Sequence, residues 1–390
     1  MIKLIKSTFY NESKTKRELA NFIKKSDWLS FGPQCEEFEK NFSKYQGRKF
    51  TVMVNSGSSA NLALIQALIN LGQLKKGDKV GFSSVTWSTN VMPLIELGLI
   101  PIAIDVELET LNVSSQKLRD TLKKHKIKAL FLTNLLGFCD DIDKISTLCK
   151  KNKIILVEDN CESLGSIYKN KKLGNFGLAS TFSFYVGHHM STVEGGAICT
   201  NNEKLAIMQK VVRAHGWDRN LAIKDQDNLR VKHNVNSTFY SRYTFYDLGY
   251  NLRPTEIQGF IGNSQLKYVN EITAKRNKTF LKLASFIYKN SKRYYPIKFN
   301  HMDFVSNFAI PVICKSTEIR DELVAKCKDK VEIRPVVGGN MLNQPFYKKY
   351  VSAKNIECKN ANLIHNQGLY FGNNPELTEK DIDTLLKIFA

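Results

Sequence analysis

Short apolar runs alternate with longer stretches of helical periodicity from about residue 50 onward. The short runs, rich in β-branched and aromatic residues, predict strands at 50–54, 79–84, 100–106, 127–136, 153–160 and 182–185. Apolar residues at helical spacing predict intervening helices at 60–74, 91–98 and 140–152. Such an alternation is typical of a doubly wound, mostly parallel sheet. Functional residues of such a sheet collect in loops at the carboxyl ends of its strands.

The second half of the chain follows a different pattern. After a predicted helix at 203–217, residues 218–245 form a long polar stretch dotted with aromatic side chains. A long helix is predicted from about Pro254 to Tyr288, because proline suits the first turn of a helix. The C-terminal part predicts strands at 306–314 and 330–336 and helices at 318–328 and 379–389.

These patterns predict two domains. We expect a large α/β domain with an N-terminal arm over residues 1–250. A long linking helix and a small α+β domain would follow over residues 251–390.

Composition and charge narrow the classes of partner. The 390 residues are 43% hydrophobic, which suffices for a real core, and the net charge is +20. The lysines are spread over turns and helix ends without a dense basic arm, so nucleic-acid binding is disfavoured. The charge could still help to attract an anionic substrate.

Membrane insertion and secretion are disfavoured as well. No run approaches the roughly eighteen apolar residues of a transmembrane helix, and the N-terminus lacks the apolar region of a signal peptide. The eight cysteines are scattered without a CxxC pair, which favours reduced thiols over a disulfide framework or an iron–sulfur site. We therefore expect a cytoplasmic protein that does not bind membranes.

Two loop positions are candidates to bind a ligand that carries both a negative and a positive group. The turn at 55–59 opens a helix directly after a strand, so that Gly57 and Ser58 could cradle a phosphate at the helix N-terminus; an ordinary N-cap is the alternative. Asp159 ends an apolar strand, where its carboxylate could hold the protonated ring nitrogen of a pyridine cofactor or merely cap the strand.

Three further positions lie near the same predicted sheet edge. Trp87 follows a strand and could stack on a flat cofactor or belong to the core, and Ser183 could add a phosphate contact. His188 and His189 stand side by side before a Glu-Gly-Gly turn, as metal ligands, a general base or neither. Metal ligation is disfavoured, because adjacent side chains point apart and no acid or cysteine cluster accompanies the pair.

One ordered set of motifs runs through nearly the whole chain: GSSA (57–60), TW (86–87), VEDN (157–160), FSFY (182–185), EGG (194–196) and GYNLRPTEIQ (249–258). This set resembles that of the DegT/StrS-type sugar aminotransferases and their dehydratase relatives. The resemblance implies the aspartate-aminotransferase-like fold of pyridoxal phosphate (PLP) enzymes of fold type I. That fold has a large domain on a mostly parallel seven-stranded sheet and a smaller C-terminal α+β domain.

One position departs from the aminotransferase pattern. The aminotransferases of this family carry a lysine six residues before the EGG glutamate, and it forms a Schiff base with the cofactor. Glu194 is that glutamate here, so the matching position is His188, and residues 173–203 contain no lysine. Imidazole cannot replace the amine in this bond. The family's 3-dehydratases carry histidine there, and VGHHMSTVEGG (186–196) and EIRPVVGGNMLNQPFY (332–347) resemble that branch.

The resemblance therefore implies a dehydration. Pyridoxamine phosphate (PMP), bound without a covalent link, would condense with the C4 ketone of a nucleotide-linked 4-keto-6-deoxy sugar. His188 would remove a proton from the C4′ carbon of the cofactor while hydroxide leaves C3 of the sugar. The products would be a 3,6-dideoxy-4-keto sugar and ammonia, and glutamate would reload the amine. A sugar aminotransferase with an atypical base and a non-catalytic regulatory homologue are the alternatives.

The resemblance also implies roles for other residues. Gly57, Ser58 and Ser183 match phosphate-binding positions, and Asn251 matches an asparagine that reaches the phosphate from a neighbouring subunit, which implies a homodimer with shared sites. Glu162 replaces a Gln or His near the cofactor's phenolic oxygen, and its role is open. His189 would only shape the loop. Four candidates, with surface salt bridges as the alternative, would bind sugar, diphosphate or glutamate carboxylate: His215, Arg219, Arg253 and Arg334.

Another dehydratase subgroup holds an iron–sulfur cluster in a cysteine-rich insert that would fall at about 215–240. That region contains no cysteine here, so we expect the cluster-free, redox-neutral branch. A GDP-linked sugar is expected from the cluster-free relatives, with CDP as an open alternative. Hexose and heptose substrates both stay open, and a bacterial envelope polysaccharide pathway is implied by resemblance.

Overall fold

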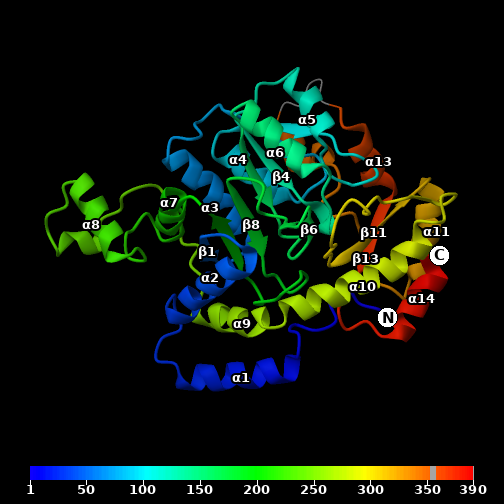
Figure 1. Cartoon of the computed structure of the whole chain (residues 1–390), viewed down its shortest axis with the longest axis horizontal. Helices are drawn as coiled ribbons and strands as arrows, with labels where there is room; N and C mark the ends of the chain where they lie inside the picture. Colours follow the sequence, from blue (N-terminus) through cyan, green and yellow to red (C-terminus); the bar gives the residue numbers. More distant parts are fainter. Residues whose placement is uncertain (352–356, 390) are drawn as a thin grey trace.

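Seven strands form the main sheet of the protein, whose computed structural model describes residues 1–351 and 357–389. Strand β9 pairs antiparallel with both of its neighbours, whereas the other four pairings are parallel. The sequence prediction of a mostly parallel sheet is thus confirmed (Figure 1). In spatial order the strands are β1 (Phe50–Val54), β9 (Gly196–Thr200), β8 (Ala179–Ser183), β5 (Ile155–Asp159), β4 (Ala129–Thr133), β2 (Lys79–Ser83) and β3 (Ile100–Ile104).

One predicted strand is displaced along the sequence. Only the first half of the expected run at 182–185 belongs to β8, which spans Ala179–Ser183. From there the backbone N–H of Phe184 and Val186 donates to the carbonyl oxygens of Gly195 and Val193, so the chain leaves the sheet in a narrow loop before returning as β9. This loop carries the histidine doublet out of the sheet.

Helices cover both faces of the main sheet. Helix α3 is apolar around most of its surface because it is buried between the sheet and α7, and the side chain of Ser56 caps it by accepting from the N–H of Ser59. The helices and turns associated with this sheet are α1 (Glu12–Lys25), α2 (Pro33–Gln46), α3 (Gly57–Asn70), η1 (Ser88–Asn90), α4 (Met92–Glu96), α5 (Ser115–Leu122), η2 (Leu135–Gly137), α6 (Ile142–Lys151) and α7 (Glu203–Arg213).

A second, wholly antiparallel sheet lies beside the first. Its spatial order is β10 (Tyr294–Tyr295), β11 (Ala309–Cys314), β13 (Gly368–Gly372) and β12 (Ile333–Pro335). One continuous apolar core joins the two sheets. The elements around the second sheet, with one separate hairpin (β6 and β7), are α10 (Val269–Ile287), α11 (Thr317–Cys327), η4 (Met341–Asn343), α12 (Pro345–Tyr350), α13 (Lys359–Gln367), α14 (Glu379–Phe389), β6 (Ile167–Tyr168) and β7 (Lys171–Lys172).

The linking helix is two helices, so the prediction of one continuous helix is wrong. Helix α9 (Glu256–Leu266) ends and α10 begins at Val269. Pro254 lies before the helix, which starts with a capping box between Thr255 and Gln258. Helix α9 packs on α1 and α2, whereas α10 packs on α14. The domain boundary between residues 250 and 251 stays a prediction. The N-terminal Ile2 pairs with Val331 beside the second sheet, so the N-terminal arm also contacts the C-terminal part of the chain.

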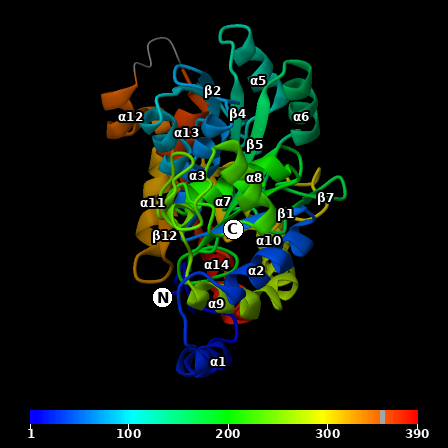
Figure 2. The same cartoon turned by 90° about the vertical axis from the view of Figure 1, so that its left-hand side faces the viewer.

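The polar stretch after α7 leaves the body of the molecule. It contains α8 (Ile223–Lys232) and η3 (Tyr240–Tyr243), and Figure 1 shows α8 standing off beyond α7. Figure 2 shows α1 at another extremity of the molecule, below α9. The exposed large apolar side chains of this projecting segment are Ile223, Val231, Phe239, Tyr240, Tyr243, Phe245 and Leu248. Among the described residues, no helix is long and apolar enough to cross a membrane.

A buried ion pair ties α2, β1 and α7 together. The guanidinium of Arg213 is fully buried, and its Nη1 donates to Glu39 Oε1 at 2.5 Å and to the carbonyl oxygen of Met53 at 2.8 Å. Glu39 also accepts the backbone N–H of Met53 at 2.8 Å. Removal of either charge would leave its partner buried and unpaired.

We expect Glu39→Ala to lower the free energy of unfolding by about 3–5 kcal/mol, because it strands the buried Arg213 charge. Urea unfolding followed by circular dichroism measures the change. The matched control is Glu12→Ala, which breaks the exposed pair of Glu12 with Lys16 and should leave the midpoint nearly unchanged. Equal midpoints for the two variants would contradict this account of the buried pair.

Candidate active site

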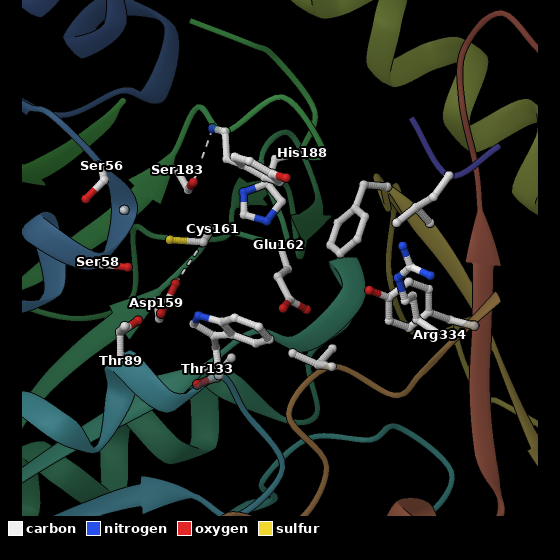
Figure 3. A pocket seen from close by; sticks show the side chains of 18 of the residues that line it. Ser56, Ser58, Thr89, Thr133, Asp159, Cys161, Glu162, Ser183, His188 and Arg334 are labelled. Atoms are coloured by element: carbon white, nitrogen blue, oxygen red, sulfur yellow. Dashed lines mark hydrogen bonds between the residues drawn. The ribbon is translucent and has the colours of Figure 1, made fainter. Parts of the chain in front are cut away.

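A cavity of about 510 Å³ lies where the carboxyl ends of the parallel strands meet the second sheet (Figure 3). Loops after β1, β2, β5 and β8 supply one wall, and residues of β12 and β13 supply the other. This is the edge at which the sequence pattern predicted functional residues. The predicted site residues that line it are Gly57, Ser58, Trp87, Asp159, Glu162, Ser183, His188 and Arg334.

The N-terminus of α3 forms one end of this cavity. Ser56, Gly57 and Ser58 line it together with Ser183 from the end of β8. A Cβ atom on Gly57 would lie 2.6 Å from the Cβ of Ser183, so only glycine fits between the helix start and the strand. The unpaired N–H groups and positive dipole end of the helix thereby remain accessible to an anion.

Asp159 supplies a negative charge near the centre of the cavity. Its Oδ2 accepts from the side-chain amides of Asn61 at 3.0 Å and Asn90 at 2.8 Å, and its Oδ1 accepts from the N–H of Cys161 at 2.9 Å. All three donors are neutral, and no ion pair involves Asp159 within the described ranges. The carboxylate is therefore oriented but not neutralised, which suits a cation in the cavity.

His188 lies on the narrow loop after β8, with its ring facing the cavity (Figure 3). Burial lowers the pKa of the imidazole to about 4; the charge of Arg276 adds to the lowering and that of Asp159 opposes it. The ring is therefore a neutral base near pH 7. His189, by contrast, is turned inward, and its Nε2 lies 3.0 Å from the carbonyl oxygen of Ser306.

Arg276 on α10 holds the loop of His188 in place. Its guanidinium is buried and donates to the carbonyl oxygen of His188 at 3.1 Å, and to those of Asn373 and Phe308 on the second sheet's side. It has no carboxylate partner among the described residues, and burial lowers the pKa of Arg276 to about 9. Sequence reasoning missed this residue because a single arginine within a helix carries no signal of its tertiary partners.

Glu162 is a second titratable group on the cavity wall. Its Oε2 accepts the backbone N–H of Leu136 at 2.9 Å. Burial, aided by the negative charge of Asp159, raises the pKa of Glu162 to about 8. Trp87 also lines the cavity, with 55% of its surface exposed. The indole thus presents a free aromatic face at the cavity mouth.

Four of the predicted residues do not line this cavity in its own chain. Asn251 is exposed and accepts from Arg253 Nε at 3.0 Å. The ring of His215 lies 5.1 Å from that of Trp217, and the Arg219 guanidinium lies over the same indole at 4.5 Å. Arg334, by contrast, lines the cavity and pairs with Glu332 at 2.5 Å. The substrate-binding roles of all these residues stay predictions.

Several lining residues come from segments that the sequence did not single out. Leu4 and Ile5 arrive from the N-terminus, and Phe308 and Tyr370 arrive from the second sheet. Their only sequence signal is apolarity, which cannot distinguish a cavity wall from a core. The remaining lining residues that were missed are Ser56, Thr89, Asn90, Thr133, Cys161, Tyr185, Gly187, Glu194, Glu332, Pro335 and Val337.

The chain belongs to the DegT/DnrJ/EryC1/StrS aminotransferase family, whose model matches residues 11–390. This confirms the family and the fold that the ordered motifs suggested. A GDP-4-keto-6-deoxy-D-mannose 3-dehydratase of Yersinia pseudotuberculosis is 35% identical over 372 residues, which cover 93% of this chain and 92% of that protein.

Solved structures agree over the whole length. A crystal structure of GDP-4-keto-6-deoxymannose-3-dehydratase with a trapped PLP–glutamate geminal diamine has a TM-score of 0.89 at 32% identity and covers 100% of both chains. A variant of an enzyme of the same name, with bound GDP-perosamine, has a TM-score of 0.88 at 32% identity and again covers 100% of both chains. The likeness in fold therefore extends over both sheets.

We expect Arg276→Met to raise the pKa of His188 from about 4 toward its ordinary value of 6.5, because the variant removes a nearby positive charge but leaves the burial. NMR titration of the imidazole in cofactor-free protein measures the shift. Arg276→Lys keeps the charge and should keep the low value. Arg293→Met at an exposed pair is the control for general effects. An unchanged titration in Arg276→Met would contradict the electrostatic role.

Proposed function

We propose that the chain is a PLP/PMP-dependent 3-dehydratase of a nucleotide-linked, GDP-activated 4-keto-6-deoxy sugar. It would remove the C3 hydroxyl to give a 3,6-dideoxy-4-keto sugar, with glutamate regenerating PMP and ammonia released. The observation that carries the proposal is the histidine that faces the cavity at the family's lysine position. The matching relatives named as GDP-4-keto-6-deoxy-D-mannose 3-dehydratases support the same activity.

The cavity fits a phosphorylated pyridine cofactor. The accessible N-terminus of α3, with Ser58 and Ser183, suits the phosphate, and the cradle would be filled by any side chain at Gly57. Asp159, which is oriented by three neutral donors, suits a protonated ring nitrogen. Trp87 offers a flat aromatic face. When bound, PMP supplies an amine and an electron-withdrawing pyridinium ring.

His188 moves the proton in both halves of the proposed cycle. A neutral imidazole on the cavity wall can accept the proton of the C4′ carbon, because burial keeps its pKa low. No lysine belongs to the residues that line the described cavity. The described cavity therefore offers no side-chain amine that could bond covalently to the cofactor. This favours dehydration over transfer of the amine to the sugar.

The substrate contacts are proposed from charge and position. Arg334 lines the cavity on the second sheet's wall and presents a planar cation to a diphosphate or a carboxylate. His215, Arg219 and Arg253 lie outside the cavity of their own chain and would serve a neighbouring subunit's cavity. The GDP moiety is proposed from the names of the relatives, and a CDP-linked sugar is the competing substrate in the assay below.

The active protein is proposed to be a homodimer without an iron–sulfur cluster. Asn251 is exposed in its own chain, as expected for a residue that reaches a partner's phosphate site. The projecting segment with α8 carries large apolar side chains that suit burial in such an interface. The region 215–240 contains no cysteine, which favours the cluster-free branch.

Incubation of the purified protein with PLP, glutamate and a GDP-linked 4-keto-6-deoxy sugar, without a reductase, should release ammonia and a 3-deoxy sugar. His188→Asn should abolish this release by at least about 100-fold while the cofactor still binds, because asparagine cannot accept the proton. Mass spectrometry of the sugar, ammonia release and cofactor absorbance are the measurements. A stable amino sugar would favour the aminotransferase reading. A cofactor spectrum that glutamate cannot change would favour a non-catalytic homologue. Faster turnover of a CDP-linked sugar would identify CDP rather than GDP as the nucleotide of the substrate.

Shared sites predict complementation between two impaired variants. After His188→Asn and Asn251→Ala proteins are mixed and allowed to exchange subunits, each hybrid dimer has one site with both native residues. Random pairing should then restore about one quarter of the wild-type activity. Mixing each variant with itself is the control. No gain in the mixture would mean that Asn251 acts within its own chain or not at all.

A further inference from the structure

Two titratable groups of the cavity, Glu162 after β5 and His188 on the loop after β8, have pKa values shifted in opposite directions. Burial raises the pKa of Glu162 to about 8 and lowers that of His188 to about 4. Near pH 7 both groups are therefore neutral, with the proton on the carboxyl group. Figure 3 shows the carboxyl of Glu162 and the ring of His188 facing the same space. An enzyme that assigns acid and base roles to two groups separates their pKa values in this way.

The backbone fixes one oxygen of Glu162 and leaves the other free. Oε2 accepts the N–H of Leu136, and Oε1 has no donor among the described residues. Leu136 is buried and has a positive φ of 51°, a left-handed conformation that is strained for an L-residue. The following Gly137 is confined as well, because a Cβ there would lie 2.2 Å from the carbonyl oxygen of Ser306. This strained turn aims the carboxyl into the cavity.

The charges around Glu162 do not favour its ionised form. Asp159 on β5 is an anion, and Cys161 and Tyr370 are half-buried groups whose pKa values are themselves raised, mainly by desolvation. His188 on the loop after β8 is neutral. Arg334 on β12 is paired with Glu332, and Glu162 forms no ion pair within the described ranges. The carboxyl group therefore faces anions and neutral groups, and it keeps its proton at neutral pH.

We propose that Glu162 is the general acid of the dehydration, donating its proton to the C3 oxygen of the sugar as the C3–O bond breaks. This inference rests on the proposed function. With cofactor and sugar bound, His188 would take the proton of the C4′–H bond. The electron pair of that bond would then allow the C3–O bond to break, with its electron pair leaving on the oxygen. That oxygen takes the proton of Glu162 and leaves as water. Glu162 becomes a carboxylate and His188 an imidazolium, and return of one proton through the cavity restores both.

The experiment compares Glu162→Gln with the wild type at the two halves of the cycle. Glutamine keeps the size and the hydrogen bond from Leu136 but has no acidic proton. We expect sugar dehydration to fall by about 100-fold or more, whereas amine loading from glutamate, followed by cofactor absorbance, stays within a few-fold. Glu162→Asp keeps an acid and should retain more dehydration than Glu162→Gln, which guards against a mere folding defect.

A second measurement needs no turnover. In cofactor-free wild-type protein, infrared spectroscopy should detect a protonated carboxyl band that disappears with a midpoint near pH 8 and is missing in Glu162→Gln. The control is Asp140→Asn, because Asp140 is another carboxyl with a raised pKa but lies outside the cavity. That variant should keep both the band and the activity.

The outcomes separate the inference from the proposed function. Wild-type protein that releases no ammonia or 3-deoxy sugar would contradict the proposed function itself. Active wild-type protein with an equally active Glu162→Gln variant would overturn the acid role alone. A carboxyl midpoint near the ordinary value of 4.5 in cofactor-free protein would overturn it too.

Discussion

Burial of titratable groups where the two sheets meet is the constraint on which the rest of the site depends. Burial is the largest cause of the pKa shifts of Glu162, His188 and Arg276. The second sheet supplies this burial, because Phe308 and Tyr370 close the wall opposite the parallel strands. The packing of the second sheet against the first thus sets the protonation states of these groups, and the loops determine only their orientation.

Fixed charges at the carboxyl edge of the main sheet act together with this burial. The N-terminus of α3 attracts an anion, and Asp159 attracts a cation, so that a ligand with a phosphate at one end and a protonated ring nitrogen at the other is held at two points. Helix α3 follows β1 and Asp159 ends β5, so both charges are positioned by strands of the main sheet. His188, by contrast, sits on a loop that a buried arginine ties to the second sheet. The geometry between cofactor and base therefore depends on how the two sheets pack.

Local sequence patterns were enough to predict many elements of this structure, but they predicted none of its long-range contacts. The strands, the helix opened by Gly57, and the strand-end position of Asp159 were predictable because each depends on neighbours in sequence. The break between α9 and α10 was not, since both segments have helical periodicity and only packing on different partners separates them. The strained Leu136 and the carbonyl contacts of Arg276 were equally invisible, because their partners lie 26 to 97 residues away.

The two departures from the aminotransferase pattern, at His188 and Glu162, have a common physical explanation in this cavity. Where the family's aminotransferases have a lysine, a buried imidazole can move a proton but cannot hold the cofactor covalently. Where they have a neutral amide or imidazole beside the phenolic oxygen, Glu162 provides a carboxyl that burial keeps protonated. In an aminotransferase a proton donor at that position would compete with amine transfer, because it would promote loss of a neighbouring hydroxyl from the sugar. For a dehydratase the same donor lowers the barrier of the step that defines the reaction, so the two substitutions are expected to work as a pair.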